Sequence, residues 1–251
     1  MDIRLDGRTA LVTGSTGGIG VGIARALAEA GAFVVVAGRD AIRGNEVVAK
    51  IIADGGAAAF VAADLGAGEQ AARTLAAEAI TAAGGRIDIL VNNAAMLIDP
   101  TPTADVSAEL VTAALAVNVT APFLLTGLLA PAMAERGGGA IVNVGSINGL
   151  AGAGRSALYS MTKAAIHSLT KSWAGEYAAS GVRVNTVAPG PTATDHNLAR
   201  EALLAPIMAR IPAGRMSTVD EVGAAVVFLA SEAAGNIHGA TLSVDGGYAA
   251  V

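Results

Sequence analysis

The fold is decided by residues 9–20, TALVTGSTGGIG. Residues 9–13 form an apolar, β-branched run typical of a buried strand, and residues 14–20 form a glycine-rich turn that leads into a helical pattern. The glycines let the chain turn tightly, let a pyrophosphate approach the backbone and let the helix pack closely on the strand. The start of the helix then offers unpaired N–H groups to phosphate. This stretch therefore predicts a dinucleotide-binding turn, in a spacing that differs from the commoner G-x-G-x-x-G.

The rest of the chain continues the alternation of strand and helix that begins at residue 9. Six more strands are predicted at 33–37, 57–62, 87–91, 140–144, 182–187 and 241–244. Helical patterns lie between them, as at 19–30, 69–83 and 157–179. Strands that are apolar throughout are typical of a parallel sheet covered on both faces. We predict a single α/β domain over 1–251, doubly wound, with a seven-stranded parallel sheet flanked by helices.

The composition of the 251 residues narrows the classes of partner. Only 15% of them are charged, against about 25% in a typical globular chain, so we expect part of the surface to be buried against other copies of the chain. The net charge of −5, without a basic tract, argues against a nucleic-acid partner. The chain has no cysteine, and its three histidines show no metal-ligand spacing, so we expect neither disulfides nor a metal site.

Two segments bear on location. The start of the chain, residues 1–7, is charged and lacks the apolar run of a signal peptide, so we expect a cytoplasmic protein. Residues 110–134 carry no charge and are long enough to cross a bilayer, but Pro122 and Pro131 would break a spanning helix. We predict a buried helix, a turn and a second helix there, and no membrane partner.

The end of the second predicted strand indicates which dinucleotide binds. A carboxylate at this position would accept hydrogen bonds from the adenosine ribose hydroxyls and repel a 2′-phosphate. The chain instead has Gly38 followed by Arg39, whose guanidinium can pair with a phosphate. We therefore expect NADP(H) in preference to NAD(H), which is left open as a second cofactor. Asp40, one residue further on, would weaken this preference.

Five motifs together resemble the short-chain dehydrogenase/reductase family, over essentially the whole chain. They are TGSTGGIG at 13–20, NNAA at 92–95, Tyr159-x-x-x-Lys163, Pro189-Gly190 and DGG at 245–247. Their order and spacing make the resemblance specific. It implies a Rossmann fold and an NADP-dependent oxidoreductase that interconverts a ketone and a secondary alcohol by hydride transfer. Tyr159 and Lys163 also make chemical sense, since residues four apart share one helix face and an ammonium favours phenolate over phenol.

The resemblance assigns a role to each matching residue. It makes Tyr159 the general acid and base, Lys163 the group that holds the nicotinamide ribose and lowers the pKa of Tyr159, Ser146 the hydrogen-bond partner of the substrate oxygen, and Asn118 the residue that positions a water in a proton relay. The implied cofactor contacts are Gly14, Ser15, Thr16, Gly18, Ile19, Gly20, Arg39, Asp64, Leu65, Asn92, Ala94, Tyr159, Lys163, Pro189, Gly190, Thr192 and Thr194.

The resemblance also implies a substrate class, a lid and an assembly. The substrate would be a small-molecule carbonyl or alcohol, covered by a small lid at about residues 191–216, which is largely apolar here. The assembly would be a homotetramer with two-fold axes, whose interfaces use the helices around Asn118 and Tyr159.

Two departures from the family pattern matter. NADP-specific members often carry a basic residue where this chain has Gly17, so phosphate recognition would rest mainly on Arg39. Gly175 stands where reductases of carrier-protein thioesters tend to present an arginine, which weakens that substrate assignment. A 3-oxoacyl-thioester reductase, a sugar or polyol dehydrogenase and a non-catalytic NADPH-binding regulator are the alternatives. The motif residues of the proposed active site are all retained, which favours an enzyme over a regulator.

Overall fold

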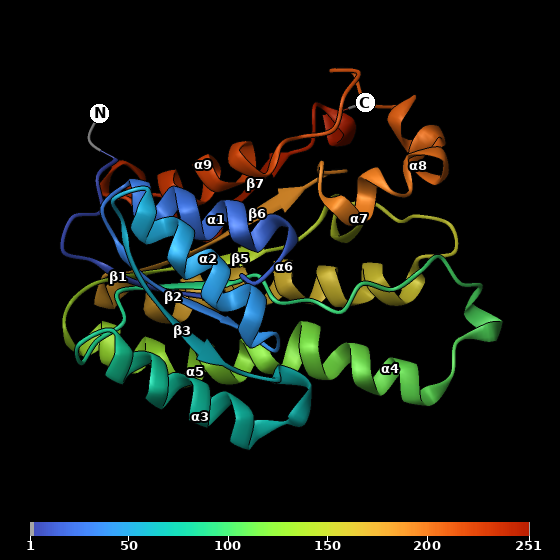
Figure 1. Cartoon of the computed structure of the whole chain (residues 1–251). Helices are drawn as coiled ribbons and strands as arrows, with labels where there is room; N and C mark the ends of the chain where they lie inside the picture. Colours follow the sequence, from blue (N-terminus) through green and yellow to red (C-terminus); the bar gives the residue numbers. More distant parts are fainter. Residues whose placement is uncertain (1–2, 251) are drawn as a thin grey trace.

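The computed structural model describes residues 3–250, apart from the side chains of residues 201 and 203. It contains a seven-stranded sheet of order β3-β2-β1-β4-β5-β6-β7 in which all neighbouring strands are parallel (Figure 1). The strands are β1 (Thr9–Thr13), β2 (Phe33–Gly38), β3 (Ala57–Ala62), β4 (Ile89–Asn92), β5 (Gly139–Val144), β6 (Val182–Pro189) and β7 (Thr241–Val244). The predicted doubly wound α/β fold with seven parallel strands is confirmed.

Strand β4 begins two residues later than the prediction of 87–91 and ends one residue later. The reason lies in Asp88, whose side-chain carboxylate, rather than a backbone carbonyl, accepts the hydrogen bond of the Thr9 N–H at 2.9 Å. The regular pairing of β1 with β4 therefore starts one step further along the sheet, at Ala10 and Ile89.

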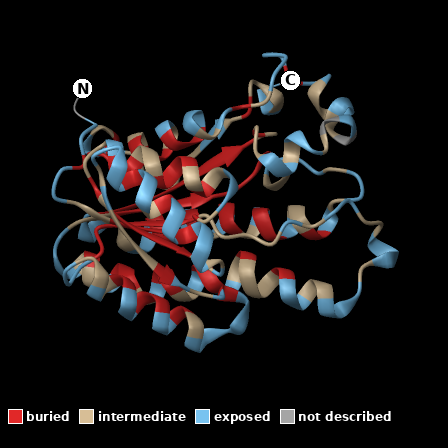
Figure 2. Cartoon of the chain, viewed as in Figure 1, coloured by how far each residue is buried: buried red, intermediate tan, exposed pale blue. Residues whose placement is uncertain are grey.

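Two layers of helices cover the sheet (Figures 1 and 2). On one face lie α1 (Gly18–Glu29), α2 (Ala41–Ala53) and α9 (Val219–Ala230), and on the other α3 (Glu69–Ala82), α5 (Ala121–Glu135) and α6 (Ala157–Tyr177). Successive strand residues point to opposite faces, so Val12 packs with Ile23 of α1 while Leu11 packs with Leu125 of α5. Each such side chain, once buried, stabilises the fold by about 1.5–3 kcal/mol.

Residues 108–135 form one continuous helix, so the predicted turn is wrong. It consists of α4 (Ala108–Leu115), a π-helical segment η3 (Ala116–Thr120) and α5. In the widened π turn the Ala121 N–H bonds to the Ala116 carbonyl, five residues back. Pro122 follows at the start of α5, where the helix continues without a bond from this residue. Pro131 lies inside α5.

The same helix is long and apolar enough to cross a membrane, judged by length and composition over the described residues. Its inner side is occupied in this fold, because Leu125, Leu129 and Met133 are buried in the core beneath the sheet.

The chain crosses the sheet between β3 and β4, because β4 pairs with β1 at the centre rather than with β3 at the edge. In doubly wound sheets ligands bind at such a switch point, beyond the carboxyl ends of the strands. The short helices α7 (Asp195–Leu198) and α8 (Glu201–Met208) extend past this carboxyl edge (Figure 1). The remaining short segments are 3₁₀ turns: η1 (Leu65–Ala67), η2 (Thr103–Asp105), η4 (Ile147–Gly149), η5 (Ala178–Ser180), η6 (Glu232–Ala234) and η7 (Tyr248–Ala250).

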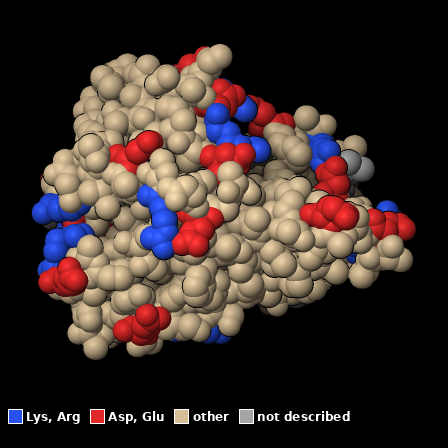
Figure 3. All heavy atoms as spheres, turned by 90° about the horizontal axis from the view of Figure 1, so that it is seen from below, with Lys and Arg blue, Asp and Glu red and all other residues tan. Residues whose placement is uncertain are grey.

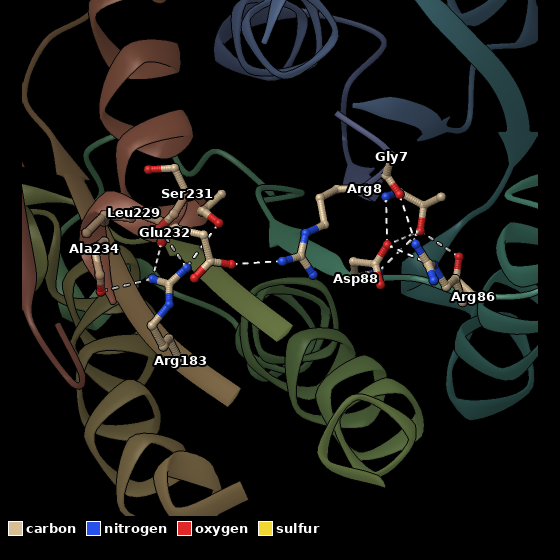
Figure 4. Close-up of polar contacts among 11 residues, drawn as sticks. Gly7, Arg8, Arg86, Asp88, Arg183, Leu229, Ser231, Glu232 and Ala234 are labelled. Atoms are coloured by element: carbon tan, nitrogen blue, oxygen red, sulfur yellow. Dashed lines mark hydrogen bonds and ion pairs between the residues drawn. The ribbon is translucent and has the colours of Figure 1, made fainter. Parts of the chain in front are cut away.

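The amino edge of the sheet is closed by a buried arginine (Figure 4). The Arg183 guanidinium, on β6, donates hydrogen bonds to four backbone carbonyls at the end of α9, those of Leu229, Ala230, Ser231 and Ala234. The carbonyls of Leu229 and Ala230 belong to the last turn of α9, where a helix leaves carbonyls unpaired and carries the negative end of its dipole. Those of Ser231 and Ala234 lie in the segment that follows the helix. Burial lowers the pKa of Arg183, and the nearby Glu232 charge opposes this.

Candidate active site

The glycine turn after β1 is shaped for a pyrophosphate. Gly14 and Gly18 adopt φ values of +64° and +54°, in the left-handed region that favours glycine. A Cβ atom on Gly14 would lie 2.7 Å from the Ala94 Cα, and one on Gly20 would lie 2.3 Å from the Gly14 oxygen. Helix α1 begins at this turn with no side-chain cap and no acidic residue in its first turn, so its N–H groups are left for an anion. The residues present therefore fit a dinucleotide.

Asn93 fastens the turn to the end of β4. Its side-chain amide donates to the carbonyls of Thr13 and Gly14 at 2.8 and 3.0 Å. The Thr13 hydroxyl accepts in return from the backbone N–H groups of Asn93 and Ala94, each at 3.0 Å. Neither residue was singled out as a site residue from the sequence. An asparagine pair that directly follows a central strand is the signal that points to this clasp.

The predicted cofactor contacts next to the turn fall into two groups. Thr194 lies at the turn, since a Cβ on Gly18 would be 3.8 Å from its methyl group, and Thr16 lies against Gly38 at the end of β2. Ser15 instead faces inward, where its hydroxyl donates to the Val12 carbonyl at 2.7 Å and accepts from the Ala37 N–H at 3.0 Å. The Ser15 backbone N–H donates to the Ala37 carbonyl at 3.0 Å, so neither its hydroxyl nor its N–H is left for a ligand.

The contacts predicted at the other strand ends are also partly engaged by the protein. Asp64 follows β3 and accepts a hydrogen bond from the Gly66 N–H. The Asn92 amide donates to the Asn143 side chain at 2.9 Å inside the core, so its side chain does not face the carboxyl edge. Thr192 is buried and donates to the Gly190 carbonyl, which closes the turn after Pro189. Ile19 and Leu65 pack into the core beside these turns.

Ser146, Tyr159 and Lys163 meet at the carboxyl edge of the sheet. Ser146 follows β5, and the other two lie one turn apart on α6. Burial raises the pKa of Tyr159 to about 12, and a hydrogen bond between its side chain and that of Ser146 opposes this rise. Lys163 is buried, its Nζ donates to the Val144 carbonyl at 2.8 Å, and burial lowers its pKa to about 8.

This differs from the expectation that Lys163 lowers the pKa of Tyr159. The Lys163 Nζ lies 5.7 Å from the centre of the Tyr159 ring and is directed to the Val144 carbonyl. Burial of the phenol is the larger effect, so Tyr159 is protonated at neutral pH. In this state it can donate a proton.

Asn118 lies in the π-helical segment and is buried. Its side chain accepts from the Met96 N–H at 2.6 Å and donates to the Met96 carbonyl and to the Thr162 hydroxyl. These bonds tie the segment after β4 to α6. The backbone carbonyl of Asn118 would receive its α-helical bond from residue 122, and Pro122 has no N–H to give. This carbonyl can therefore accept a hydrogen bond from water, which suits the predicted relay role.

His167, one turn after Lys163 on α6, contacts the backbone of Ser146. Its Nε2 lies 3.1 Å from the Ser146 carbonyl oxygen and its Nδ1 lies 3.2 Å from the Thr241 hydroxyl. Because a carbonyl only accepts, Nε2 carries the proton. Burial lowers the pKa of His167, as do the charges of Lys163 and Lys171, while the bond to Ser146 raises it. The i, i+4 spacing from Lys163 is the only sign of this contact in the sequence.

Three segments gather beside the beginning of α6. An ion pair joins Arg200, between α7 and α8, to Asp99 in the segment after β4, and the hydrogen bond from Arg200 holds the pKa of Asp99 below its usual range. The Thr101 N–H donates to the Arg155 carbonyl at 2.6 Å, which links the segment after β4 to the one before α6. Each segment carries an exposed leucine: Leu97, Leu150 and Leu198.

Comparison with known proteins places this site in a family. A protein-family model described as enoyl-(acyl carrier protein) reductase matches residues 14–249. D-threitol dehydrogenase of Mycolicibacterium smegmatis is 38% identical, over 98% of this chain and 95% of its own length. The chain belongs to the short-chain dehydrogenase/reductase family. It is therefore an oxidoreductase that acts on alcohol or ketone groups, as the resemblance implied.

Solved structures of short-chain dehydrogenases/reductases share the whole fold. A structure from Beutenbergia cavernae, named for NAD(P)-dependent gluconate 5-dehydrogenase activity and holding NADP at low occupancy, is 40% identical with a TM-score of 0.93, over 100% of both chains. A 3-oxoacyl-(acyl-carrier-protein) reductase from Agrobacterium tumefaciens, with NADP bound, is 37% identical with a TM-score of 0.91, over 98% of this chain and 96% of that one.

Proposed function

We propose that this protein is an NADP(H)-dependent oxidoreductase that interconverts a ketone and a secondary alcohol on a small molecule. The observation that carries the proposal is the hydrogen-bonded pair of Ser146 and Tyr159 at the carboxyl edge of the sheet, beside the buried Lys163. Two hydroxyl groups held together in this way can both donate a hydrogen bond to one substrate oxygen.

The cofactor assignment has two supports. The two solved relatives described above hold NADP, and Arg39 stands at the end of β2 where a carboxylate would repel a 2′-phosphate. The glycine turn and the amino end of α1 would hold the pyrophosphate, and Lys163 would reach the nicotinamide ribose. Bound NADP(H) supplies a hydride to the carbonyl carbon, or accepts one from the alcohol.

Side chains of the protein donate the proton to the substrate and return one to the donor. Tyr159, protonated at neutral pH, donates its hydroxyl proton to the substrate oxygen during reduction, while Ser146 donates a hydrogen bond to the same oxygen. Lys163 and a water held by the Asn118 carbonyl would return a proton to Tyr159. In alcohol oxidation the direction reverses, so Tyr159 must first lose its proton. We therefore expect oxidation to speed up as the pH rises toward 10, whereas reduction does not depend on that loss.

Substrate recognition falls to the three segments that carry Leu97, Leu150 and Leu198. Their exposed side chains offer apolar contact, and the Arg200–Asp99 ion pair joins two of the segments. Relatives named for polyol, sugar-acid and acyl-carrier substrates are all similar to this chain over nearly its whole length.

The test is NADPH oxidation over a panel of acetoacetyl thioesters, keto sugars, cyclic ketones and diketones. We expect turnover on one class, and Tyr159→Phe should lower kcat at least about 100-fold while leaving the Kd for NADPH within about twofold. Tyr177→Phe is the matched control, because it removes a hydroxyl from the other end of the same helix. Tight NADPH binding with no turnover on any class would reject the enzyme and support the regulator.

We also infer a homotetramer in the cytoplasm. An apolar, concave patch on η3, α5 and α6 supports the assembly. It is lined by Val119, Phe123 and Leu169, among others, and Phe123 is 53% exposed while its ring contacts Trp173. Charges are sparse and scattered on the face seen from below in Figure 3, which supports burial against other copies. Phe123→Glu should lower the oligomeric state measured by sedimentation, and cell fractionation tests the location.

A further inference from the structure

The loop between β5 and α6 begins and ends at the candidate active site, because Ser146 precedes it and Tyr159 lies in the first turn of α6. Arg155 is the only charged residue between these two. It is exposed, and among the side chains that the structure describes its guanidinium has neither a hydrogen bond nor an ion pair. Four residues of chain span at most about 14 Å, so the Cα atoms of Arg155 and Tyr159 lie no further apart than this. The loop therefore holds one unpaired cation close to the reacting groups.

The backbone of Arg155 is strained. Its φ is +64°, and over residues 3–250 it is the only residue other than glycine in the left-handed region. The two glycines just before it, Gly152 and Gly154, have no positive φ, and a Cβ on either would meet nothing within 4 Å. The loop thus has glycine where a side chain would fit and an arginine where a side chain is disfavoured. A side chain retained at a strained position indicates that the side chain itself has a role.

The segment after β4 holds the backbone of Arg155 in place. The Thr101 N–H donates to the Arg155 carbonyl at 2.6 Å, and the Thr101 hydroxyl donates to the Asp99 carbonyl at 2.8 Å. Asp99 is the only acidic residue of this segment, taken as residues 93–102, and its carboxylate is ion-paired with Arg200. The carboxylate of this segment is therefore occupied by the other arginine, and the guanidinium of Arg155 is left for a ligand.

We propose that Arg155 binds an anionic group, a carboxylate or a phosphate, that the substrate carries apart from the carbonyl or alcohol that reacts. This inference rests on the proposed function and names the substrate class of the same site. A guanidinium can donate two parallel hydrogen bonds to a carboxylate or a phosphate, and it stays charged at any working pH. A substrate held by this group at one end is fixed in orientation, with its carbonyl directed to Tyr159 at the other.

The test compares pairs of ketones that differ in charge, in the presence of NADPH. Methyl-ketone acids with chains of about four to seven carbons place a carboxylate at increasing distance from the ketone, and the methyl ester of each acid is its neutral partner. Dihydroxyacetone phosphate and dihydroxyacetone form the corresponding pair for a phosphate. We expect the anion of at least one pair to exceed its neutral partner in kcat/KM by about 10-fold or more, and this advantage should fall as the ionic strength rises. The pair with the largest ratio distinguishes a carboxylate from a phosphate.

Variants at residue 155 separate the charge from the backbone. Arg155→Gly removes the side chain and adopts the same backbone conformation without strain, so the ratio of anion to neutral partner should fall to about one. Binding of NADPH to this variant checks that the site is still folded. Arg155→Lys, which keeps the charge without the planar fork, should retain part of the advantage.

Arg8→Met is the control, because it removes an exposed, ion-paired arginine from the opposite edge of the sheet and changes the net charge equally. It should leave the ratio unchanged. Equal kcat/KM within every pair, or an advantage of the anion that survives Arg155→Gly, would overturn the proposal, while turnover of the neutral ketones would leave the proposed function in place.

The proposed function fails separately, if NADPH binds but no ketone is turned over. Binding of the same anions to the NADPH complex, measured by the fluorescence of the bound nicotinamide, then decides on Arg155 alone. Anion binding that is lost in Arg155→Gly supports the proposal, and an anion that does not bind to the wild type, or binds equally to the variant, overturns it.

Discussion

Charged side chains are paired differently at the amino edge of the sheet, where the strands begin, and at the carboxyl edge, where they end. At the amino edge Arg183 donates to four backbone carbonyls, and Arg8 and Arg86 pair with Glu232 and Asp88 (Figure 4). At the carboxyl edge some charges are paired as well, Arg200 with Asp99 among them, but Lys163 donates to a single carbonyl and Arg39 has no partner among the described residues. An edge whose polar groups are satisfied by the protein stabilises the fold, whereas an edge that leaves them unsatisfied is prepared for another molecule.

The largest loss of stability is expected from a substitution of Arg183 at the amino edge. Replacing it with Met removes the donor from four carbonyls at the end of α9, so we expect the free energy of unfolding to fall by about 3–5 kcal/mol. Urea denaturation followed by circular dichroism measures this. The exposed Arg8–Glu232 pair gives the scale for an ordinary surface contact, and Arg8→Met should cost less than about 1 kcal/mol. Equal losses in the two variants would show that the buried network does not hold this edge.

Lys163→Met should have the opposite effect on stability. The pKa of Lys163 is about 8 in the fold, against an ordinary value of 10.5 for lysine, so the unfolded chain binds more protons between these values, and the stability of the wild type rises with pH through that window. Near pH 7 the variant, which buries no charge, should be more stable by up to about 3 kcal/mol, and the difference should shrink toward pH 10. The variant should also lose turnover. Thermal unfolding at both pH values checks the gain, and a variant less stable than the wild type at pH 7 contradicts it.

His167→Gln should produce a smaller, pH-dependent effect. The folded chain keeps this imidazole neutral below its usual pKa, so the wild type loses stability as the pH falls below about 6.5, with a slope of at most about 1.4 kcal/mol per pH unit. The Gln amide can still donate to the Ser146 carbonyl but cannot take up a proton. We expect a flatter stability profile between pH 4 and 6.5, with kcat near that of the wild type at pH 7.

His167→Leu provides the contrast, since it removes the donor to Ser146 altogether. It should lower kcat more than it changes the Kd for NADPH, because Ser146 contacts the substrate oxygen in the proposed mechanism. If the Gln and Leu variants have the same kcat, His167 does not position Ser146.

The features that local sequence pattern predicts well are those that depend on neighbours along the chain. The bounds of β1, β3 and β7 match the predicted ranges. For β1 the reason is that a strand buried on both faces is apolar throughout, whereas β3 and β7 lie at the two sides of the sheet and are partly exposed. The glycine turn is legible for a similar reason, since its conformation and its function both require residues without a side chain.

The features that could not be predicted are contacts between residues far apart in the sequence and one exception to a local rule, a proline that does not break its helix. Arg183 meets Leu229 46 positions later, and within its strand it looks like any polar residue. Arg43 reaches Gly17 only because β2 brings the start of α2 beside the turn. Pro122 suggests a helix break, and the break is avoided by widening one turn by a single residue. None of these leaves a periodic signal.

The order of the strands also bears on how the protein is made. From β4 onward each new strand joins the sheet beside the one before it, in the order β4, β5, β6, β7, and always on the same side of β1. A nascent chain leaving the ribosome can therefore add each strand to an edge that already exists, without reopening pairs made earlier. At each stage the unpaired edge on this side is the newest strand, so the segment at risk of misassembly on that side is a short and recent one.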